Sequence, residues 1–424
     1  MDTSQISQYK SNYLWNLLGS VSSALISTLL LLIASRELGA TQSDIFSIVY
    51  SISQQLIIIG LFQVRNYQAT DVSGRISFTD YFFSRIITIL LMLLSASVFL
   101  FFQKYSLEKT LIYIFIILYR ACDAFSDVYQ GQLQQNRRSD LAGKILFFRS
   151  IIAIVNFFII LKITESLVIT SFGIFLVNAL LTFILDIPIL RESRITGPIK
   201  LDKNTVSSTF LILKQCFPLF LNGFIITYIF TEPKLVIDQL LSRDIFASGM
   251  QRNFNILFMP TFILNLLFII LRPMITELSY DWENKKFDIF NKKVKNISKV
   301  LLFFGIITII FSYFVGTFLL SFVFGVDLNS YSIELVVLIL AGLFNVFATM
   351  IDNLMTIFRR QKLLLPVYII TFIFSKILNY PMIFSFGISG AAISFLISMV
   401  IYFVLSIIIY FYSFQTLSKR IVVA

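Results

Sequence analysis

Apolar runs of about 20 residues recur along the whole chain and are separated by short polar segments. A helix of about 20 residues is long enough to cross the hydrocarbon core of a bilayer, so each run predicts a transmembrane helix. The pattern therefore predicts an all-α polytopic membrane protein. Its twelve predicted spans lie near residues 13–35, 44–64, 80–102, 109–131, 141–161, 167–190, 208–230, 244–271, 298–324, 331–357, 363–384 and 388–413.

The longest polar segment before the middle of the chain divides the spans into six and six. It predicts an N-terminal lobe over 1–190, a cytoplasmic linker over 191–207 and a C-terminal lobe over 208–424. The tripeptide Asp-Ile-Phe begins the second span of each half, at 44–46 and at 244–246. Parallel repeats of this kind are found in transporters that move two halves about a central site.

The distribution of charge predicts the orientation in the membrane. Only 13% of the 424 residues are charged, and the net charge is +11. Of the 34 Lys and Arg residues, 22 fall on the side of the two termini, six on the other side and six within spans. The positive-inside rule therefore places both termini in the cytoplasm, and this asymmetry explains the basic charge without a nucleic-acid partner. The chain has no His, which excludes His-based catalysis, metal sites and proton relays.

Charged residues deep inside the spans are candidates for function, because charge in a membrane is costly and usually faces a polar interior. Asp186 and Asp352 lie near span ends and are interpreted as interfacial charges, while Arg85 and Lys214 are expected to extend to the cytoplasmic interface. The four deeper basic residues are predicted to face one water-accessible cavity and to bind a diphosphate, for which arginine is suited. They are Arg120, Arg149, Arg252 and Lys376.

The fourth span, which contains Arg120, carries a polar stripe. Asp123, Asp127, Gln130 and Gln134 follow at spacings that place all five residues on one helical face. One interpretation is structural: Arg120 and Asp123 pair and hold the helix against its neighbours. The other is that the stripe lines a passage, with Asp123 and Asp127 responding to a H⁺ or Na⁺ gradient. If Asp123 pairs with Arg120, Asp127 is left as the switch.

The Lys-rich segment 272–299 is interpreted as an ordinary cytoplasmic loop, with an amphipathic helix on the anionic inner leaflet as the alternative.

Several short motifs stand out along the chain: Lys10-Ser11-Asn12, residues 34–39, Ser51-Ile52, Gln130-Gly131 with 137–144, and 387–392. They resemble motifs of bacterial polysaccharide flippases of the multidrug/oligosaccharidyl-lipid/polysaccharide exporter (MOP) superfamily. The resemblance implies two six-helix lobes in a V-shaped exporter fold with alternating access. It also implies ion-driven transport of undecaprenyl-diphosphate-linked oligosaccharide repeat units from the inner to the outer leaflet of the bacterial cell membrane. No enzymatic activity or cofactor is implied, and the expected partners are the lipid-linked substrate, membrane lipids and other polysaccharide-assembly proteins.

Two other functions remain open. A drug or metabolite antiporter of the same superfamily should have an acidic cavity if its substrates are cations, whereas here the basic residues within spans outnumber the acids. A membrane-embedded polysaccharide polymerase or ligase should have a sizeable outer loop. The longest outer loop predicted here, near 231–243, has about a dozen residues.

Overall fold

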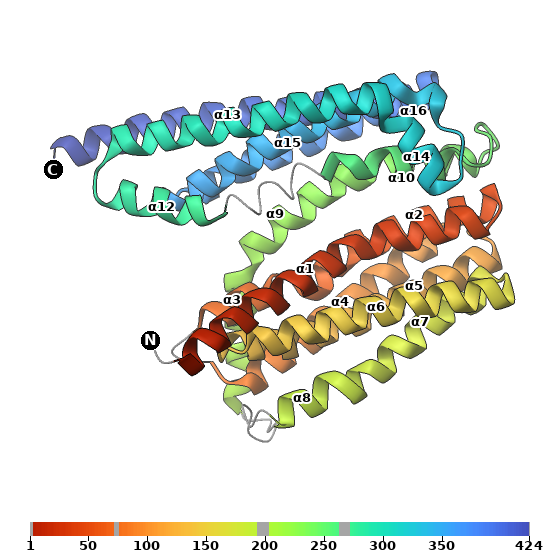
Figure 1. Ribbon diagram of the computed structural model, residues 1–424, viewed down its shortest axis with the longest axis horizontal. Coiled ribbons are helices and arrows are strands. Elements are labelled where there is room, and N and C mark those ends of the chain that lie inside the picture. The colour runs from red at the N-terminus through yellow and green to blue at the C-terminus, as the bar shows by residue number, and fades with distance from the viewer. Residues whose placement is uncertain (1–2, 72–75, 193–202, 263–271, 424) are drawn as a thin grey trace. The chain divides into compact units, whose positions relative to one another are not determined.

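The computed structural model describes residues 3–71, 76–192, 203–262 and 272–423, which are almost entirely helical (Figure 1). The chain divides into two compact units, Met1–Phe224 and Ile225–Ala424, and the division falls inside one long helix. The predicted linker 191–207 lies mostly outside the described residues, as does the end of the eighth predicted span.

The first unit consists of helices that pack side by side, as Figure 1 shows for α1 with α6 and for α2 with α5. Serine side chains cap the N-termini of several of them: Ser77 forms a reciprocal capping box with Asp80, and Ser106 caps the helix that carries the polar stripe. The helices are α1 (Thr3–Glu37), α2 (Ala40–Leu61), α3 (Val64–Thr70), α4 (Phe78–Phe102), α5 (Leu107–Gln135), α6 (Ser139–Thr164), α7 (Leu167–Leu181), the π-helix η1 (Thr182–Asp186), α8 (Ile187–Glu192) and α9 (Lys203–Leu241).

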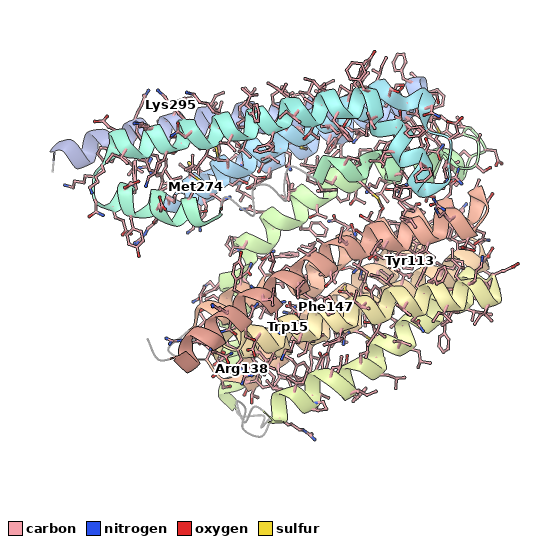
Figure 2. The ribbon with its side chains drawn as sticks, viewed as in Figure 1. Trp15, Tyr113, Arg138, Phe147, Met274 and Lys295 are labelled. Carbon is pink, nitrogen blue, oxygen red and sulfur yellow. The ribbon has the colours of Figure 1, made fainter. Side chains whose placement is uncertain are left out.

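Glycine allows α1 and α6 to pack with their backbones in close approach. A Cβ atom added at Gly143 would lie 2.2 Å from the carbonyl oxygen of Trp15, and one added at Gly19 would lie 2.6 Å from the carbonyl oxygen of Gly143. Beside this contact the ring of Trp15 packs against that of Phe147, with centroids 6.0 Å apart (Figure 2). Small residues at such crossings are typical of membrane helices, where close van der Waals packing drives association.

The second unit begins within α9 and continues through helices of very different lengths. Three of the long ones, α13, α15 and α16, lie alongside one another (Figure 1). The elements are α10 (Met250–Phe258), η2 (Met259–Phe262), α12 (Arg272–Glu283), α13 (Phe287–Phe311), the π-helix η3 (Ser312–Gly316), α14 (Thr317–Phe324), η4 (Asn329–Tyr331), α15 (Ser332–Ile357), η5 (Gln361–Leu364) and α16 (Leu365–Val423).

Helix α16 contains the last two predicted spans, which meet at Gly387. This glycine has a φ of 59°, in the left-handed region that residues with a side chain rarely adopt. The two parts then run antiparallel and touch: the Ser394 hydroxyl donates to Asn379 Oδ1 over 2.6 Å, and a Cβ at Gly390 would lie 2.0 Å from the Met382 carbonyl oxygen. The two spans therefore form a tight helical hairpin.

Nine helical segments in the described part of the chain are long and apolar enough to cross a membrane. One of them, Gln361–Leu417, holds the two spans that meet at Gly387, so the nine cover ten of the predicted spans. The fourth predicted span is α5, whose charged stripe lowers its hydropathy. The eighth is α10 and η2 together with residues outside the described ranges.

Two loop predictions differ from the structure. The segment 272–299 is mainly helical, because α12 occupies Arg272–Glu283 and α13 begins at Phe287, well before its apolar run. The ordinary loop is therefore wrong, and the alternative of a helix fits the segment better. The outer loop predicted near 231–243 is shorter than expected, because α9 continues to Leu241. In both places polar residues extend a helix beyond its apolar part, and hydropathy alone does not detect such extensions.

Candidate functional site

The polar stripe of α5 meets buried arginines from neighbouring helices. Its five residues divide between two clusters, which we name after their central residues. The Arg149 cluster contains Arg120, Asp123, Arg149, Thr182 and Asp186, and the Asp127 cluster contains Arg65, Arg85, Asp127, Gln130 and Gln134.

In the Arg149 cluster one guanidinium lies between two carboxylates. Arg149 on α6 donates through Nη1 to Asp186 Oδ2 over 3.0 Å, and its Nη2 lies 3.6 Å from Asp123 Oδ1 on α5. Asp123 also accepts from Arg120 over 3.3 Å. The Arg149 Nη2 atom is buried and has no hydrogen-bond acceptor among the described residues. One donor of this guanidinium therefore lacks a hydrogen bond within the described residues.

The π-helix η1 places two partners on Arg149. Thr182 and Asp186 stand at its two ends, and both accept from the same Nη1 atom, the threonine over 3.1 Å. Single π-helical turns within α-helices are frequent at functional sites, since they change the direction in which side chains project. Asp186 is fully buried, so its interpretation as an interfacial charge is wrong.

Arg120 is held by aromatic rings as well as by Asp123. Its guanidinium lies 4.6 Å from the ring centroid of Tyr50 and 5.1 Å from that of Tyr119, and its Nε donates to Ser53 over 3.2 Å. Aromatic faces attract a cation most strongly where water is excluded. The expected pairing of Arg120 with Asp123 is present.

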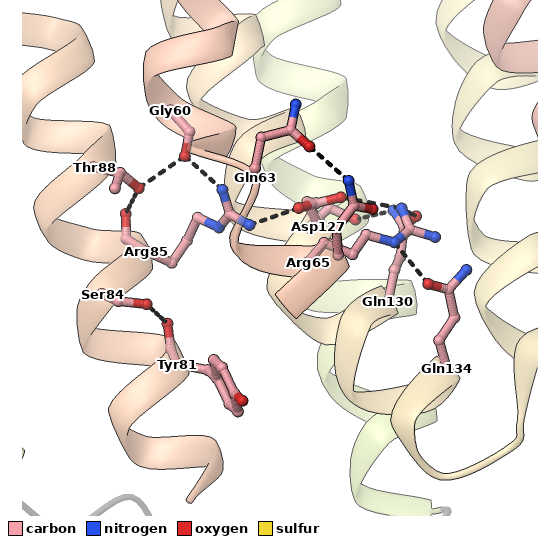
Figure 3. Close-up of polar contacts among 12 residues, drawn as sticks. Gly60, Gln63, Arg65, Tyr81, Ser84, Arg85, Thr88, Asp127, Gln130 and Gln134 are labelled. Carbon is pink, nitrogen blue, oxygen red and sulfur yellow. Dashed lines mark hydrogen bonds and ion pairs between the residues drawn. The ribbon is translucent and has the colours of Figure 1, made fainter. Parts of the chain in front are cut away.

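In the Asp127 cluster one carboxylate lies between two arginines (Figure 3). Asp127 Oδ1 accepts from Arg65 over 3.0 Å, and its Oδ2 accepts from Arg85 over 2.6 Å. Arg65 also donates to Gln130 and Gln134, over 2.9 and 3.0 Å. The C-terminal part of the stripe, from Asp127 to Gln134, is thus joined to α3, the short helix that follows α2.

Arg85 stabilises a break between α2 and α3. Phe62 and Gln63 at this break both have positive φ, 46° and 58°, so the helix cannot continue through them. The carbonyl oxygen of Gly60, near the end of α2, accepts from Arg85 and from the Thr88 hydroxyl instead (Figure 3). The Arg85 side chain is 0% exposed, so the expectation that it extends to the interface is wrong. Lys214 is exposed, as expected.

The second unit holds the other two predicted site residues on different helices. Lys376 on α16 pairs with Glu232 on α9 over 2.9 Å and lies over the ring of Tyr228, 4.8 Å from its centroid. Arg252 on α10 donates to the neighbouring Asn253 over 3.2 Å. Arg252 and Lys376 thus lie on different helices with different neighbours, and the shared cavity predicted for all four basic residues stays a prediction.

Asp352 is the other acid interpreted as an interfacial charge. Its Oδ2 accepts from the hydroxyl of Tyr368 over 2.7 Å and from that of Tyr402, and these tyrosines lie on the two antiparallel parts of α16. The carboxylate therefore ties α15 to both spans of the hairpin. Within the described ranges, no group of three or more Cys, Asp or Glu side chains is arranged to hold a metal ion.

Sequence analysis missed Arg65, Arg85 and Asp186 as charged members of the two clusters, and it missed Glu232 as the partner of Lys376. For Asp186 a signal was available: Asn178, Thr182 and Asp186 follow at intervals of four in the sixth span, and all three are buried. Such a stripe on one helix predicts a polar partner on another.

No protein-family model matches the chain, and no curated protein matches it. Solved structures match over nearly its whole length. A multidrug resistance MATE family transporter of the MOP superfamily, in an inward-facing conformation, matches with a TM-score of 0.65 at 12% identity, over 96% of this chain and 99% of that one. A mutant of the Vibrio cholerae MATE transporter VcmN matches with a TM-score of 0.61 at 14% identity, over 98% and 99%. A MOP superfamily transporter from Pyrococcus furiosus matches with a TM-score of 0.59 at 13% identity, over 97% and 95%.

Identities this low establish the fold alone. The matches confirm the predicted fold class, an all-α polytopic membrane protein, and the solved proteins that share this fold are described as transporters. The chain therefore shares its fold with the transporters of the MOP superfamily that it matches.

Proposed function

We propose that the protein is a flippase that moves undecaprenyl-diphosphate-linked oligosaccharides from the inner to the outer leaflet, for surface polysaccharide biosynthesis. The observation that carries the proposal is the excess of arginine in the two clusters of the first unit. The two clusters hold four arginines against three aspartates. A site for cationic drugs would need the opposite balance, whereas a diphosphate needs positive charge and forked donors.

Arg149 is the residue best placed to bind the diphosphate. Its Nη2 makes no hydrogen bond within the described residues, and the Asp123 carboxylate at 3.6 Å is too far for a strong one. A phosphate oxygen could take that position and release Asp123 to Arg120. One of the similar proteins, from Pyrococcus furiosus, is described as having a binding pocket of reverse polarity that suggests a different function. That description supports a departure from drug export within this fold.

The transport cycle is proposed to be alternating access driven by a H⁺ or Na⁺ gradient. Similar transporters adopt inward-facing and outward-facing conformations. The stripe offers two carboxylates for coupling, Asp123 and Asp127. The spacing in the sequence favours Asp127 as the coupling residue, but the contacts in the structure favour Asp123. Asp127 is held by two short ion pairs, whereas the Asp123 side chain is 24% exposed and makes longer contacts.

A drug or metabolite antiporter is the second candidate, and the likeness to multidrug transporters favours it. The acids available to a cationic drug are nearly all occupied by basic partners: Asp123 and Asp186 contact Arg149, and Glu232 contacts Lys376. A membrane polymerase or ligase gains no support from the short connection after α9.

Export by cells that depend on this protein tests the flippase. Arg149→Ala should reduce surface polysaccharide strongly. It also leaves the buried Asp186 carboxylate without its arginine, so export is compared at equal amounts of folded protein. Arg149→Lys should restore export only in part, because lysine lacks the fork. Arg137→Ala, which removes an exposed guanidinium, is the matched control. Binding to purified protein separates the candidates: the wild type should prefer an undecaprenyl-diphosphate-linked glycan to its monophosphate analogue and to cationic drugs. Normal export by a well-folded Arg149→Ala variant would contradict the proposal.

A further inference from the structure

Helix α13 is longer than its apolar run, and its first three turns are basic. It begins at Phe287, whereas the apolar run begins near Val300. Lys292, Lys295 and Lys299 lie in this extension and are all exposed. Their spacing of three and four residues places them on one face of the helix.

The opposite face of α13 is packed against the protein. Phe290, Ile297 and Leu301 are buried there. Lys293, which points away from the three exposed lysines, is neutralised by α12: its Nζ lies 2.9 Å from a Glu277 oxygen and 2.8 Å from an Asp281 oxygen. Figure 2 shows Lys295 on the side of α13 away from α12. The extension thus has one neutralised basic residue and a separate face that keeps its positive charge.

A hollow of about 420 Å³ lies on this charged face. One carboxylate, three ammonium groups and two amides line it, which leaves a net positive charge and hydrogen-bond donors for an anion. Its lining residues are Asp288, Asn291, Lys292, Lys295, Asn296 and Lys299.

The same helical face continues directly into exposed apolar residues. One turn after Lys299 comes Phe303, followed by Ile306 and Ile310, all exposed large side chains at helical spacing. In a membrane protein such residues contact acyl chains. From Lys292 to Lys299 the helix rises by about 10 Å, which is more than the roughly 5 to 7 Å of headgroup region on each side of a bilayer, so the lysines nearest Phe303 lie at headgroup depth and Lys292 beyond it. A lipid whose chains lie on Phe303 and Ile306 would therefore carry its phosphate beside the lysines.

We propose that this face of α13 is a binding site for the phosphate headgroup of an anionic phospholipid of the bilayer. The occupant is a resident lipid, because the apolar continuation of the charged face matches its acyl chains. The lysines attract its phosphate, and the asparagine amides donate to headgroup oxygens. The site is independent of the transported substrate. It anchors the second unit at a fixed depth in the leaflet that the basic asymmetry assigns to the cytoplasm.

Lipid titration of the purified full chain, followed by native mass spectrometry, tests the site. Phosphatidylglycerol should bind more tightly than phosphatidylcholine. Each lysine should contribute about a fivefold gain in affinity, so the Lys292→Gln, Lys295→Gln, Lys299→Gln triple variant should lose roughly 100-fold. The matched control is Lys285→Gln, Lys286→Gln, Lys362→Gln, which removes the same charge from exposed residues outside the hollow and should change affinity by less than about twofold.

The outcomes distinguish a phospholipid of the bilayer from the transported substrate as the source of the bound phosphate. Loss of phosphatidylglycerol binding in the triple variant alone, with unchanged melting temperature, supports the proposal. Equal binding of phosphatidylcholine by the wild type, or equal losses in both triple variants, overturns it. A triple variant that loses only the binding of undecaprenyl diphosphate also overturns the proposal, because that result would assign this face of α13 to the substrate. If the triple variant fails to fold, the three single variants carry the test, each with an expected loss of about fivefold.

Discussion

The Asp127 cluster makes a quantitative prediction about stability. In an Asp127→Asn variant Arg85, which is 0% exposed, would keep the Gly60 carbonyl as an acceptor but would lose its counter-ion. Removing one partner of a buried ion pair costs about 3–5 kcal/mol, because the remaining charge is uncompensated. Arg65 adds little to this cost, since its side chain is 23% exposed and can turn towards water.

The converse substitution should cost less. In Arg85→Met the Asp127 carboxylate keeps Arg65 at 3.0 Å, and the Gly60 carbonyl keeps the Thr88 hydroxyl at 2.8 Å. The loss is then about one charge-assisted hydrogen bond, roughly 1.5–3 kcal/mol. The Arg85→Met, Asp127→Asn double variant removes both buried charges and should be more stable than Asp127→Asn alone.

Apparent melting temperatures of detergent-purified protein, measured by fluorescence-detected size exclusion, give the order of the variants. A Glu37→Gln variant is the control: it breaks the exposed Lys162–Glu37 pair of 2.7 Å and should melt almost as the wild type does. If Asp127→Asn is as stable as the wild type but no longer responds to a H⁺ or Na⁺ gradient, the ion pairs of Asp127 with Arg65 and Arg85 do not stabilise the fold, and Asp127 is the coupling residue. An Asp127→Asn variant more stable than the double variant would refute the reasoning on buried charge.

The remaining predictions concern packing, pairing and orientation. Gly143→Ala should lower the melting temperature, since the new Cβ would lie 2.2 Å from a backbone oxygen of α1, whereas Gly39→Ala, with no atom within 4 Å, should not. Lys376→Met should destabilise more than Glu232→Gln, because the Glu232 side chain is 6% exposed and would be left unpaired, while that of Lys376 is 44% exposed and can reach water. A cysteine at Lys200 should resist labelling from outside intact cells, and strong labelling there would reverse the predicted orientation.

The sequence predicted the spans well, because apolar length alone decides whether a helix can cross a membrane. It failed where polar residues belong to helices. The lysines before Val300 look like a loop in a hydropathy profile, yet α13 includes them, since one of them is paired with α12. The α5 stripe was found by its spacing, but its partners were not. Arg85 and Asp186 lie near the ends of their own spans, and only the packing of α4 and η1 against α5 brings them to the stripe.

The hairpin of α16 has a consequence for how the chain enters the membrane. Its two spans are joined at Gly387 without an intervening polar loop, and their backbones already touch at Gly390. Carrying charged and polar side chains across a bilayer is the costly part of inserting a polytopic chain. The connection between these two spans carries almost no charged or polar side chains. The two spans can therefore leave the insertion machinery together as a preformed pair. A glycine that serves as a bend in the finished protein would then also act while these two spans are being inserted.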